Sequence, residues 1–452
     1  MQAWASLKKN ACAGKTAKAF CSYFCLGKKE ILALAVILIF VLLFFKPTVS
    51  GDGYGYYTIL EGVFYDHTLN FERQMRFFGA PQELYSSVTH KYVSKYAFGF
   101  PIFCAPLYLV SLGLDNVSAL HFADSFFIKE SGDTLLHQLP VGVITLIFLA
   151  LAMLFTSKIL ADFFGFKERW FILLLTYFAT PITFYSTYGV SFSHVAEAGL
   201  FSVMLFYALS NKKVKTGVLS GLLFITRYSA GVFLLPLLAQ DLLGGGRKNL
   251  SFKLKSISSP LKVLLAFLPF AIAAMLWFLV QFGSPFNSGY ESFESVFPIH
   301  FFQIFFDLDR GMLVWTPLML LSIISLLVFK DKRKWFLLSF VFLNALIYGA
   351  WTSWEGAWSF GNRFFLVLFP IYAIGIGMFL QRFSGKKAKA ALCVLALYTL
   401  FMFCLFMAQR DLIISNTSFF STIDFWFAQG NLPILFSELI KKISFFRLFF
   451  LV

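Results

Sequence analysis

The sequence predicts an all-α polytopic membrane protein, and three observations carry this prediction. First, 59% of the 452 residues are hydrophobic and only 13% are charged, whereas a soluble globular domain carries about 25% charged residues. Second, apolar stretches near the length of a transmembrane helix, about 20 residues, recur along the whole chain. Third, most lysines and arginines fall in short segments between these stretches, as in cytoplasmic loops. The net charge of +15 therefore indicates membrane topology and not nucleic-acid binding.

The apolar runs predict about eleven transmembrane helices. They are residues 31–48, 137–157, 169–187, 195–210, 215–226, 228–241, 260–282, 311–329, 335–350, 363–381 and 388–408. The run 98–113 is short and contains two prolines, so we expect a re-entrant or interfacial element on the outer face. Arg227 interrupts the stretch 215–241. Since a lone arginine in lipid is costly, two short helices should meet there near the outer surface.

The basic residues predict the orientation of the bundle. Residues 1–30 carry six lysines, and the loops NKKVK, KDKRK and GKKAKA alternate with acidic segments, which places the amino terminus in the cytoplasm. The chain then divides into a basic cytoplasmic segment (1–30), a transmembrane region (31–408) whose first outer loop is residues 49–136, and an apolar carboxyl-terminal segment (409–452). This last segment is expected to lie at the membrane interface.

Unusual polar residues gather at the predicted outer ends of the helices. Asp52 follows the first helix in the sequence SGDGYGYY (50–57). Further residues on separate outer turns are Asp66, Lys91, Lys95, His194, Glu197, Arg227, Glu355 and Arg363. Taken singly, Asp52 could cap the helix that starts near Tyr54, and Trp351, Trp354 and Trp358 could form an aromatic belt. Their common position at one membrane surface favours a shared cavity instead.

Several motifs resemble those of the GT-C superfamily of integral-membrane glycosyltransferases, in its protein-mannosyltransferase and aminoarabinose-transferase branch. The resemblance runs from about residue 30 to 408. The motifs are Asp52 after the first helix, SFSH (191–194), FGSPFNSGY (282–290), DRGMLVWTP (309–317) and WEGAWSFGNRF (354–364). Such a bundle would carry an amphipathic first outer loop. The resemblance is closest to bacterial membrane glycosyltransferases, and it implies a multi-pass protein of the inner membrane with its active site on the outer, periplasmic face.

The resemblance also implies a reaction. Such enzymes move a sugar from a polyprenyl-phosphate carrier to a lipid, glycan or protein acceptor and invert the anomeric centre. Asp52 is the expected general base, because a carboxylate must take the proton of the acceptor hydroxyl. Arg227, Arg363 and Lys91 are expected to neutralise the phosphate, and Tyr54 and Tyr56 to contact the sugar.

His194 and Glu355 are expected to bind donor or acceptor. Asp66 and Glu61 both match the second acidic residue of the family's first outer loop. No cofactor is certain, and a divalent metal requirement stays open.

Three other classes of protein are compatible with this topology. A transporter or a lipid-linked-sugar flippase should carry ionisable residues or helix breaks near mid-membrane, whereas here ionisable residues lie mostly at the predicted ends of spans, Arg227 excepted. A polymerase or ligase of surface polysaccharide should carry its large outer loop late in the chain. A purely structural membrane protein needs no convergent acids and bases. Membrane lipids are partners in every case, and nucleic acid in none.

Overall fold

A computed structural model gives the fold of the chain. It describes residues 27–78, 84–115, 135–244, 250–290, 297–356, 359–410, 412 and 418–443. Most of the predicted cytoplasmic segment 1–30 and part of the first outer loop lie outside these ranges. Each of the predicted apolar runs contains a helix, so the prediction of helices from the apolar runs is confirmed.

The described helices and strands come in the following order. The first half holds α3 (Lys28–Phe44), α4 (Gly53–Phe64), α5 (Glu72–Phe78), β1 (Leu84–Ser86), β2 (Lys91–Val93), α6 (Gly99–Asp115), α8 (Leu135–Asp162), α9 (Arg169–Phe178), α10 (Ile182–Tyr185), α11 (His194–Leu209), α12 (Lys213–Thr226), η2 (Tyr228–Phe233) and α13 (Leu234–Gly244). The second half holds α14 (Leu250–Phe282), α15 (Gln303–Phe306), α16 (Met312–Trp315), α17 (Pro317–Val328), α18 (Lys334–Gly349), η3 (Arg363–Leu368), α19 (Phe369–Arg382), α20 (Lys386–Gln409), α21 (Phe419–Ile423), η4 (Asp424–Ala428), η5 (Leu432–Ile434) and α22 (Leu435–Lys442).

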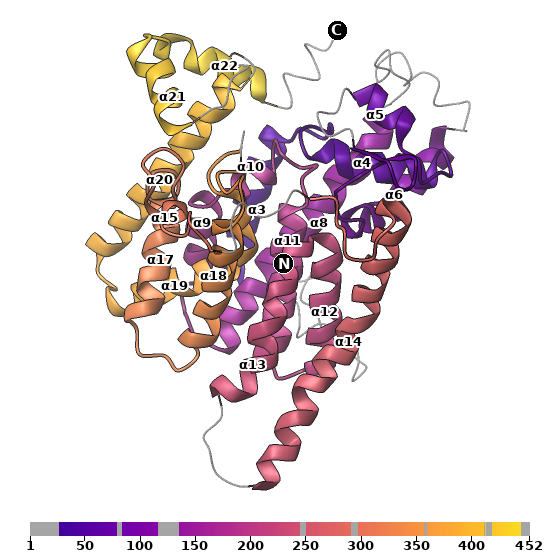
Figure 1. Ribbon diagram of the computed structural model, residues 1–452. Coiled ribbons are helices and arrows are strands. Elements are labelled where there is room, and N and C mark those ends of the chain that lie inside the picture. Colours follow the sequence, from indigo (N-terminus) through magenta and orange to yellow (C-terminus); the bar gives the residue numbers. More distant parts are fainter. Residues whose placement is uncertain are drawn as a thin grey trace, which may run out of the picture.

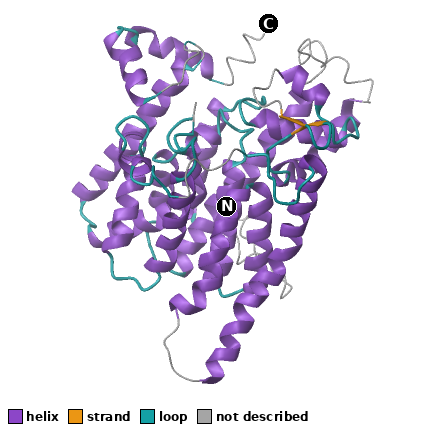
Figure 2. Cartoon of the chain, viewed as in Figure 1, coloured by secondary structure: helices purple, strands orange, loops and turns teal. Residues whose placement is uncertain are grey.

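The two ends of the helix bundle differ in structure. The short elements α4, α5, α10 and α15, together with the longer α6, lie toward its upper end in Figure 1, whereas a simple turn joins α17 to α18 toward its lower end. The strands β1 and β2 pair antiparallel, with Tyr85 opposite Tyr92, and this hairpin also lies at the upper end (Figure 2). The upper end therefore holds the segments that the sequence assigns to the outer face.

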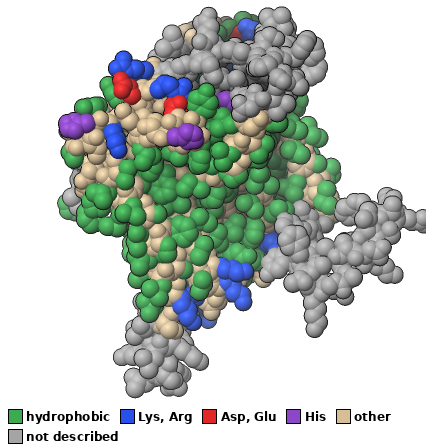
Figure 3. All heavy atoms as spheres, turned by 90° about the vertical axis from the view of Figure 1, so that its right-hand side faces the viewer, with side chains coloured by type: hydrophobic (Ala, Val, Ile, Leu, Met, Phe, Trp, Pro, Cys, Tyr) green, Lys and Arg blue, Asp and Glu red, His purple; other side chains and the backbone are tan. Residues whose placement is uncertain are grey.

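A band of apolar side chains covers the middle of the face of the bundle that Figure 3 shows. On the face shown in Figure 3, hydrophobic side chains cover the centre, Lys and Arg mark the lower end, and charges of both signs with His mark the upper end. Within the described ranges, four helices are long and apolar enough to cross a membrane: Leu136–Asp162, Ser258–Phe282, Arg363–Arg382 and Lys386–Gln409. Shorter apolar helices, such as α11, α17 and α18, lie beside them. The chain is therefore a helical membrane protein.

Small residues let neighbouring helices approach closely. Gly217 and Gly221 lie one turn apart on the face of α12 that packs against α14, and a side chain at either position would collide with Val263 or Phe270. In lipid, helix association depends on such close packing, because burial of apolar surface gives little driving force there. The glycines therefore fix α12, and the residue that follows it, against α14.

The two uncertain stretches of the sequence resolve differently. The stretch 215–241 is broken at Arg227, where the backbone turns extended (φ −157°, ψ 117°) between α12 and η2, as the sequence predicts. The stretch 98–113 forms one continuous helix, α6, with Pro106 inside it. It packs against α4 and α8, and its place at the outer membrane surface stays a prediction.

The described part of the carboxyl-terminal segment is folded. Gln409 at the end of α20 donates to Thr422 (2.7 Å), and the buried indole of Trp426 donates to the carbonyl of Leu405 (3.0 Å). The short helix α21 is further held by Asp309, whose carboxylate accepts from the backbone N–H of Phe420 (2.9 Å). These bonds dock α21 and η4 onto the carboxyl-terminal end of α20, at the upper left of Figure 1.

Candidate functional site

Asp52 sits at the start of α4 but does not cap that helix. It occupies the N-cap position with helical dihedrals (φ −56°, ψ −21°) and makes no side-chain hydrogen bond to the first turn. Its Oδ2 atom lies instead 2.8 Å from Nη1 of Arg363. The Asp52 side chain is 24% exposed and the Arg363 side chain 12% exposed, so this ion pair is largely sheltered from water. Helix capping is therefore not the role of this carboxylate.

The turn that carries Asp52 is attached to the SFSH segment. Gly51 adopts a left-handed conformation (φ +55°), and a β-carbon there would lie 2.7 Å from the ring of Phe192. The backbone N–H of Ser50 donates to the hydroxyl of Ser191, which itself donates to the carbonyl of Ser50, both at 3.1 Å. Gly53 packs against Ser191 as well. The two glycines thus allow close contact between segments of the chain itself, and this contact fixes the direction of Asp52.

Arg363 enters from the opposite side, at the first residue of η3. Gly361 precedes it in a left-handed conformation (φ +58°). The guanidinium carbon of Arg363 lies 5.4 Å from the ring centre of Phe192 and 5.3 Å from that of Phe364. Cation–π contacts of this kind orient a guanidinium without consuming its N–H donors. Arg363 therefore keeps donors available beyond the one that Asp52 occupies.

A second charged cluster lies next to the first. Arg227 contacts His194 through Nη1, at 3.0 Å from Nδ1 and 3.2 Å from Nε2, and contacts Oε1 of Glu197 through Nε at 3.5 Å. His194 Nδ1 lies 3.3 Å from Oε2 of Glu197. Both His194 and Glu197 are buried, at 1% and 3% exposure. The three side chains form a closed triangle at the amino-terminal end of α11.

One aromatic ring joins the two clusters. The guanidinium carbon of Arg227 lies 5.0 Å from the ring centre of Phe364, and that of Arg363 lies 5.3 Å from the same centre. The two guanidinium groups are therefore within about 10 Å of each other. Phe364 also stacks on Tyr348, with ring centres 4.3 Å apart and planes inclined by 6°. The site thus presents two cations on one aromatic platform.

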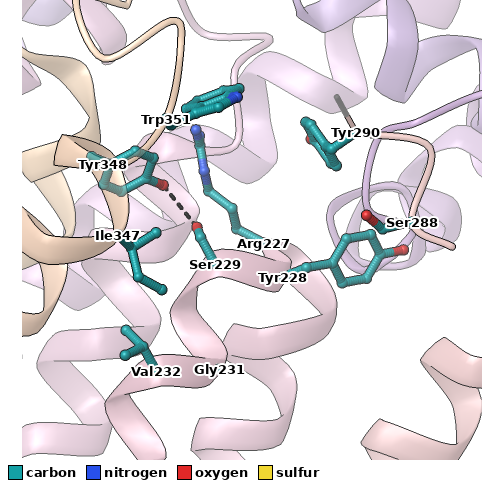
Figure 4. A pocket seen from close by; sticks show the side chains of 10 residues that line it. All are labelled: Arg227, Tyr228, Ser229, Gly231, Val232, Ser288, Tyr290, Ile347, Tyr348 and Trp351. Atoms are coloured by element: carbon teal, nitrogen blue, oxygen red, sulfur yellow. Dashed lines mark hydrogen bonds between the residues drawn. The ribbon is translucent and has the colours of Figure 1, made fainter. Parts of the chain in front are cut away.

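A cavity of about 610 Å³ opens beside Arg227. Figure 4 shows the Arg227 side chain directed between Tyr348 and Tyr290 toward Trp351. The lining residues are Arg227, Tyr228, Ser229, Gly231, Val232, Ser288, Tyr290, Ile347, Tyr348 and Trp351. Most of the lining side chains are aromatic or polar, and Gly231, Val232 and Ile347 are apolar. The cavity therefore suits a ligand with one anionic group and apolar parts.

Tyrosines connect the cavity to the first outer loop. The ring of Tyr290 packs edge-on against Tyr96 (6.5 Å), which in turn contacts Tyr56 (4.9 Å). The hydroxyl of Tyr56 lies 2.7 Å from that of Ser193, next to the buried triangle. Burial raises the pKa of Tyr290 well above its ordinary value, so this hydroxyl stays protonated and is a hydrogen-bond donor.

The remaining residues singled out in the sequence lie elsewhere. Asp66 accepts from Arg73 (2.7 Å), which also lies 3.6 Å from Glu61. Asp66 follows the far end of the twelve-residue helix α4, about 18 Å from Asp52 along the helix axis. Glu61 and Asp66 therefore belong to an ion-pair group at the opposite end of this helix.

Three further candidates have other neighbours. Lys91 lies on β2 opposite Ser86. Glu355 interacts electrostatically with Arg310. Tyr54 is half-buried against the core. The structure brings together Asp52, Tyr56, His194, Arg227 and Arg363, and it does not place Asp66, Lys91 or Glu355 in direct contact with them.

The described residues offer no ready set of metal ligands. No group of three or more His, Cys, Asp or Glu side chains among them could hold a metal ion. Asp52 faces a guanidinium, and the His194–Glu197 pair is occupied by Arg227. Because these donors do not fit a divalent cation, no step of the proposed reaction is assigned to a metal ion.

Several lining residues were not singled out from the sequence. Tyr348 and Ser229, whose hydroxyls lie 2.7 Å apart, come from a plain apolar helix and from the residues after Arg227. Lys95, which the sequence did single out, has its ammonium 5.9 Å from the ring centre of the lining residue Tyr290. Trp351 lines the cavity, and Trp354 stacks on His300 (5.4 Å), so neither serves simply as a membrane anchor; Trp358 lies outside the described residues.

Comparison with known proteins adds little to this description. No protein-family model matches the chain, and no curated protein sequence does so either. Among solved structures, the chain is similar to the crystal structure of ArnT from Cupriavidus metallidurans bound to undecaprenyl phosphate, with 12% sequence identity and a TM-score of 0.46. The similarity covers 91% of this chain and 77% of that one. This similarity is too low to assign a function, so a function has to be inferred from the site itself.

Proposed function

We propose that the chain is a membrane glycosyltransferase of the GT-C type, which moves a sugar from a polyprenyl-phosphate donor to an acceptor at the outer face of the inner membrane. One observation carries the proposal: the carboxylate of Asp52 and the guanidinium of Arg363 meet at 2.8 Å, although they come from opposite ends of the chain. Arg227 and its cavity lie on the other side of Phe364. A base and two phosphate-binding cations are the groups that this reaction requires.

The cavity suits the donor. Arg227 is the charged residue among those that line it, and a guanidinium matches phosphate oxygens in a bidentate geometry. Gly231, Val232 and Ile347 give an apolar wall for the first part of a lipid chain, which would continue into the bilayer. Tyr290 and Trp351 offer the flat apolar faces and the hydroxyl donor that a sugar ring needs.

In the proposed reaction Asp52 acts as the general base. The acceptor hydroxyl attacks the anomeric carbon on the face opposite the phosphate, as in inverting glycosidases. The bond between that carbon and the phosphate oxygen breaks, and its electron pair leaves with the phosphate. The hydroxyl proton passes to Asp52. Proton transfer of this kind typically contributes about a hundred- to ten-thousandfold in rate.

The ion pair balances the charge of this step. The phosphate gains one negative charge as it leaves, and Asp52 loses one when it takes the proton. Arg363, which faces Asp52 beforehand, is then free to face the phosphate. Arg227 and Arg363 therefore neutralise the same total charge before and after transfer, without moving ions through a low-dielectric site.

Substitution of Asp52 tests the proposal. The activity is measured by mass spectrometry of surface glycans and glycolipids. Deletion of the gene should remove one sugar from them, and the wild-type gene should restore it. Asp52→Asn keeps the shape of the side chain but removes its basicity, so it should fail to restore the sugar while its level in the membrane stays normal. Asp424→Asn, in an exposed carboxylate of the carboxyl-terminal segment, is the matched control and should restore it. Full restoration by Asp52→Asn would remove Asp52 from the reaction.

A further inference from the structure

Arg227 is held from behind by two buried side chains that do not line the cavity. Glu197 contacts its Nε and His194 its Nη1, whereas the guanidinium itself borders the cavity. His194 and Glu197 are 1% and 3% exposed, so neither can touch a ligand there directly. Their contacts with Arg227 are made through these two nitrogens, and Nη2 is occupied by neither.

One histidine tautomer is compatible with the contact to Glu197 and with the contact between Arg227 and Nε2, whereas the approach of Nη1 to Nδ1 at 3.0 Å is then a packing contact and not a hydrogen bond. Nδ1 carries the proton and donates to Oε2 of Glu197, which lies 3.3 Å away. Nε2 then accepts from Nη1 of Arg227 at 3.2 Å. Glu197 accepts a second time, through Oε1, from Nε of Arg227. A neutral imidazole can play both parts, because one ring nitrogen donates while the other accepts.

The ring of His194 is itself fixed by packing. It lies edge-on to Tyr185 (5.1 Å) and nearly parallel to Phe192 (6.2 Å). Phe192 is also the ring on which Arg363 and the Gly51 turn pack. The triangle is thus built on the same segment that directs Asp52.

The backbone break at Arg227 makes this support necessary. The residue is extended between α12 and η2, so no helix ladder fixes the direction of its long side chain. An unsupported arginine loses rotamer entropy when it is ordered. A group that binds phosphate effectively must be held in its working geometry by its own hydrogen-bond partners.

From these contacts we infer that Glu197 and His194 are positioning residues, which hold the Arg227 guanidinium in the orientation that binds the anionic head of a polyprenyl phosphate. This inference deepens the proposed function and rests on it. Glu197 acts through Arg227 and touches no substrate. It follows that Glu197 determines affinity for the phosphate group and not for the lipid chain.

Ligand binding by the purified full-length chain in nanodiscs tests the inference. The probes are a polyprenyl phosphate and the polyprenol of the same length, which lacks the phosphate. Glu197→Gln should weaken binding of the phosphate about tenfold, a coupling expected of contacting charged groups, and should change polyprenol binding by less than about twofold. His194→Phe, which keeps a ring between Tyr185 and Phe192 but removes both nitrogens, should have the same selective effect and is the second variant if Glu197→Gln does not fold.

A double-mutant cycle separates positioning from a merely structural role. In the background of Arg227→Lys, where the guanidinium fork is gone, Glu197→Gln should cause no further loss of phosphate binding. Equal losses for both probes, or losses that add to that of Arg227→Lys, would overturn the inference. Failure of the wild-type chain to bind the polyprenyl phosphate would contradict the proposed function and the inference together, whereas wild-type binding left unchanged by Glu197→Gln and His194→Phe would contradict the inference alone.

Discussion

Asp52 does not make the capping hydrogen bond that its N-cap position allows. A side chain at the N-cap position typically stabilises a helix by about 1 kcal/mol when it accepts from the first turn, and Asp is among the best residues for this purpose. Here the carboxylate turns away from α4 and pairs with Arg363. A residue that gives up local stability for a distant ion pair is typical of a functional site.

Gly51 gives a prediction at this scale. Gly51→Ala should destabilise the fold by more than about 1 kcal/mol, because alanine is strained at φ +55° and its β-carbon would lie 2.7 Å from Phe192. The thermal unfolding midpoint in detergent should fall, and sugar transfer should fall with it, since the same turn directs Asp52.

Gly113 provides the matched control. It lies inside α6, and a β-carbon there meets nothing within 4 Å. Gly113→Ala should be neutral or slightly stabilising, as is usual for this exchange inside a helix. Equal midpoints for the two variants would show that the Gly51 turn is not strained by a side chain.

At the scale of elements, the charged residues of the site all stand where a helix starts or breaks. Asp52 precedes α4, His194 opens α11, Arg227 separates α12 from η2, and Arg363 opens η3. Polar backbone groups are unsatisfied at such positions, and side chains there are less constrained by the helix. Helix ends also meet at the membrane surface, which is why residues of four separate segments converge.

This pattern explains how much of the fold and the site can be predicted from the sequence. Apolar runs and flanking charges suffice to locate the helices and the break at Arg227, because hydrophobic length and the cost of a charge in lipid are local properties. The proximity of Asp52 and Arg363 was expected from the resemblance of their motifs. The partnership of Glu197 with Arg227, and the contact of Lys95 with Tyr290, depend on how turns pack against one another. No local pattern encodes that packing.

A turn at the other end of the bundle gives a prediction about pH. Asp331 accepts from Arg333 through both carboxylate oxygens (3.0 and 2.6 Å), and Arg333 stacks on Phe164 at 4.1 Å. The hydrogen bonds from Arg333 hold the pKa of Asp331 below its ordinary value. The pair therefore contributes stability that is fully present above the unfolded pKa of about 4 and is lost as the pH falls through the folded value.

Asp331→Asn measures this contribution. The side chains are partly exposed, so the variant should lower the unfolding midpoint at neutral pH by only about 1–3 °C. The difference from wild type should shrink as the pH falls below about 4. A difference that persists unchanged at low pH would mean that the carboxylate does not stabilise the turn through its charge.

At the scale of the whole molecule, ion pairs accompany the excess of basic residues at the lower end. Glu30 pairs with Arg169 (3.0 Å) and Glu168 with Lys389 (2.6 Å), in addition to Asp331 with Arg333. These acids thus neutralise only part of the local positive charge, and the surplus of lysine and arginine remains the signal for the cytoplasmic side.

Cysteine labelling in intact cells tests the predicted orientation. In a background without other cysteines, Val88→Cys lies in the exposed turn between β1 and β2 and should react with a membrane-impermeant maleimide added outside. Lys386→Cys, exposed at the start of α20, should react only after the cells are permeabilised. The opposite pattern would invert the topology and move the site to the cytoplasm.

The distance along the chain between Asp52 and Arg363 has a consequence for biosynthesis. About 300 residues separate them, and a ribosome adds about 5–20 residues per second, so the arginine is made roughly 15–60 s after the aspartate. A nascent chain arrested before η3 carries the acid without its cation. Under the proposed function, a half-inserted molecule is therefore expected to stay inactive until η3 has been made.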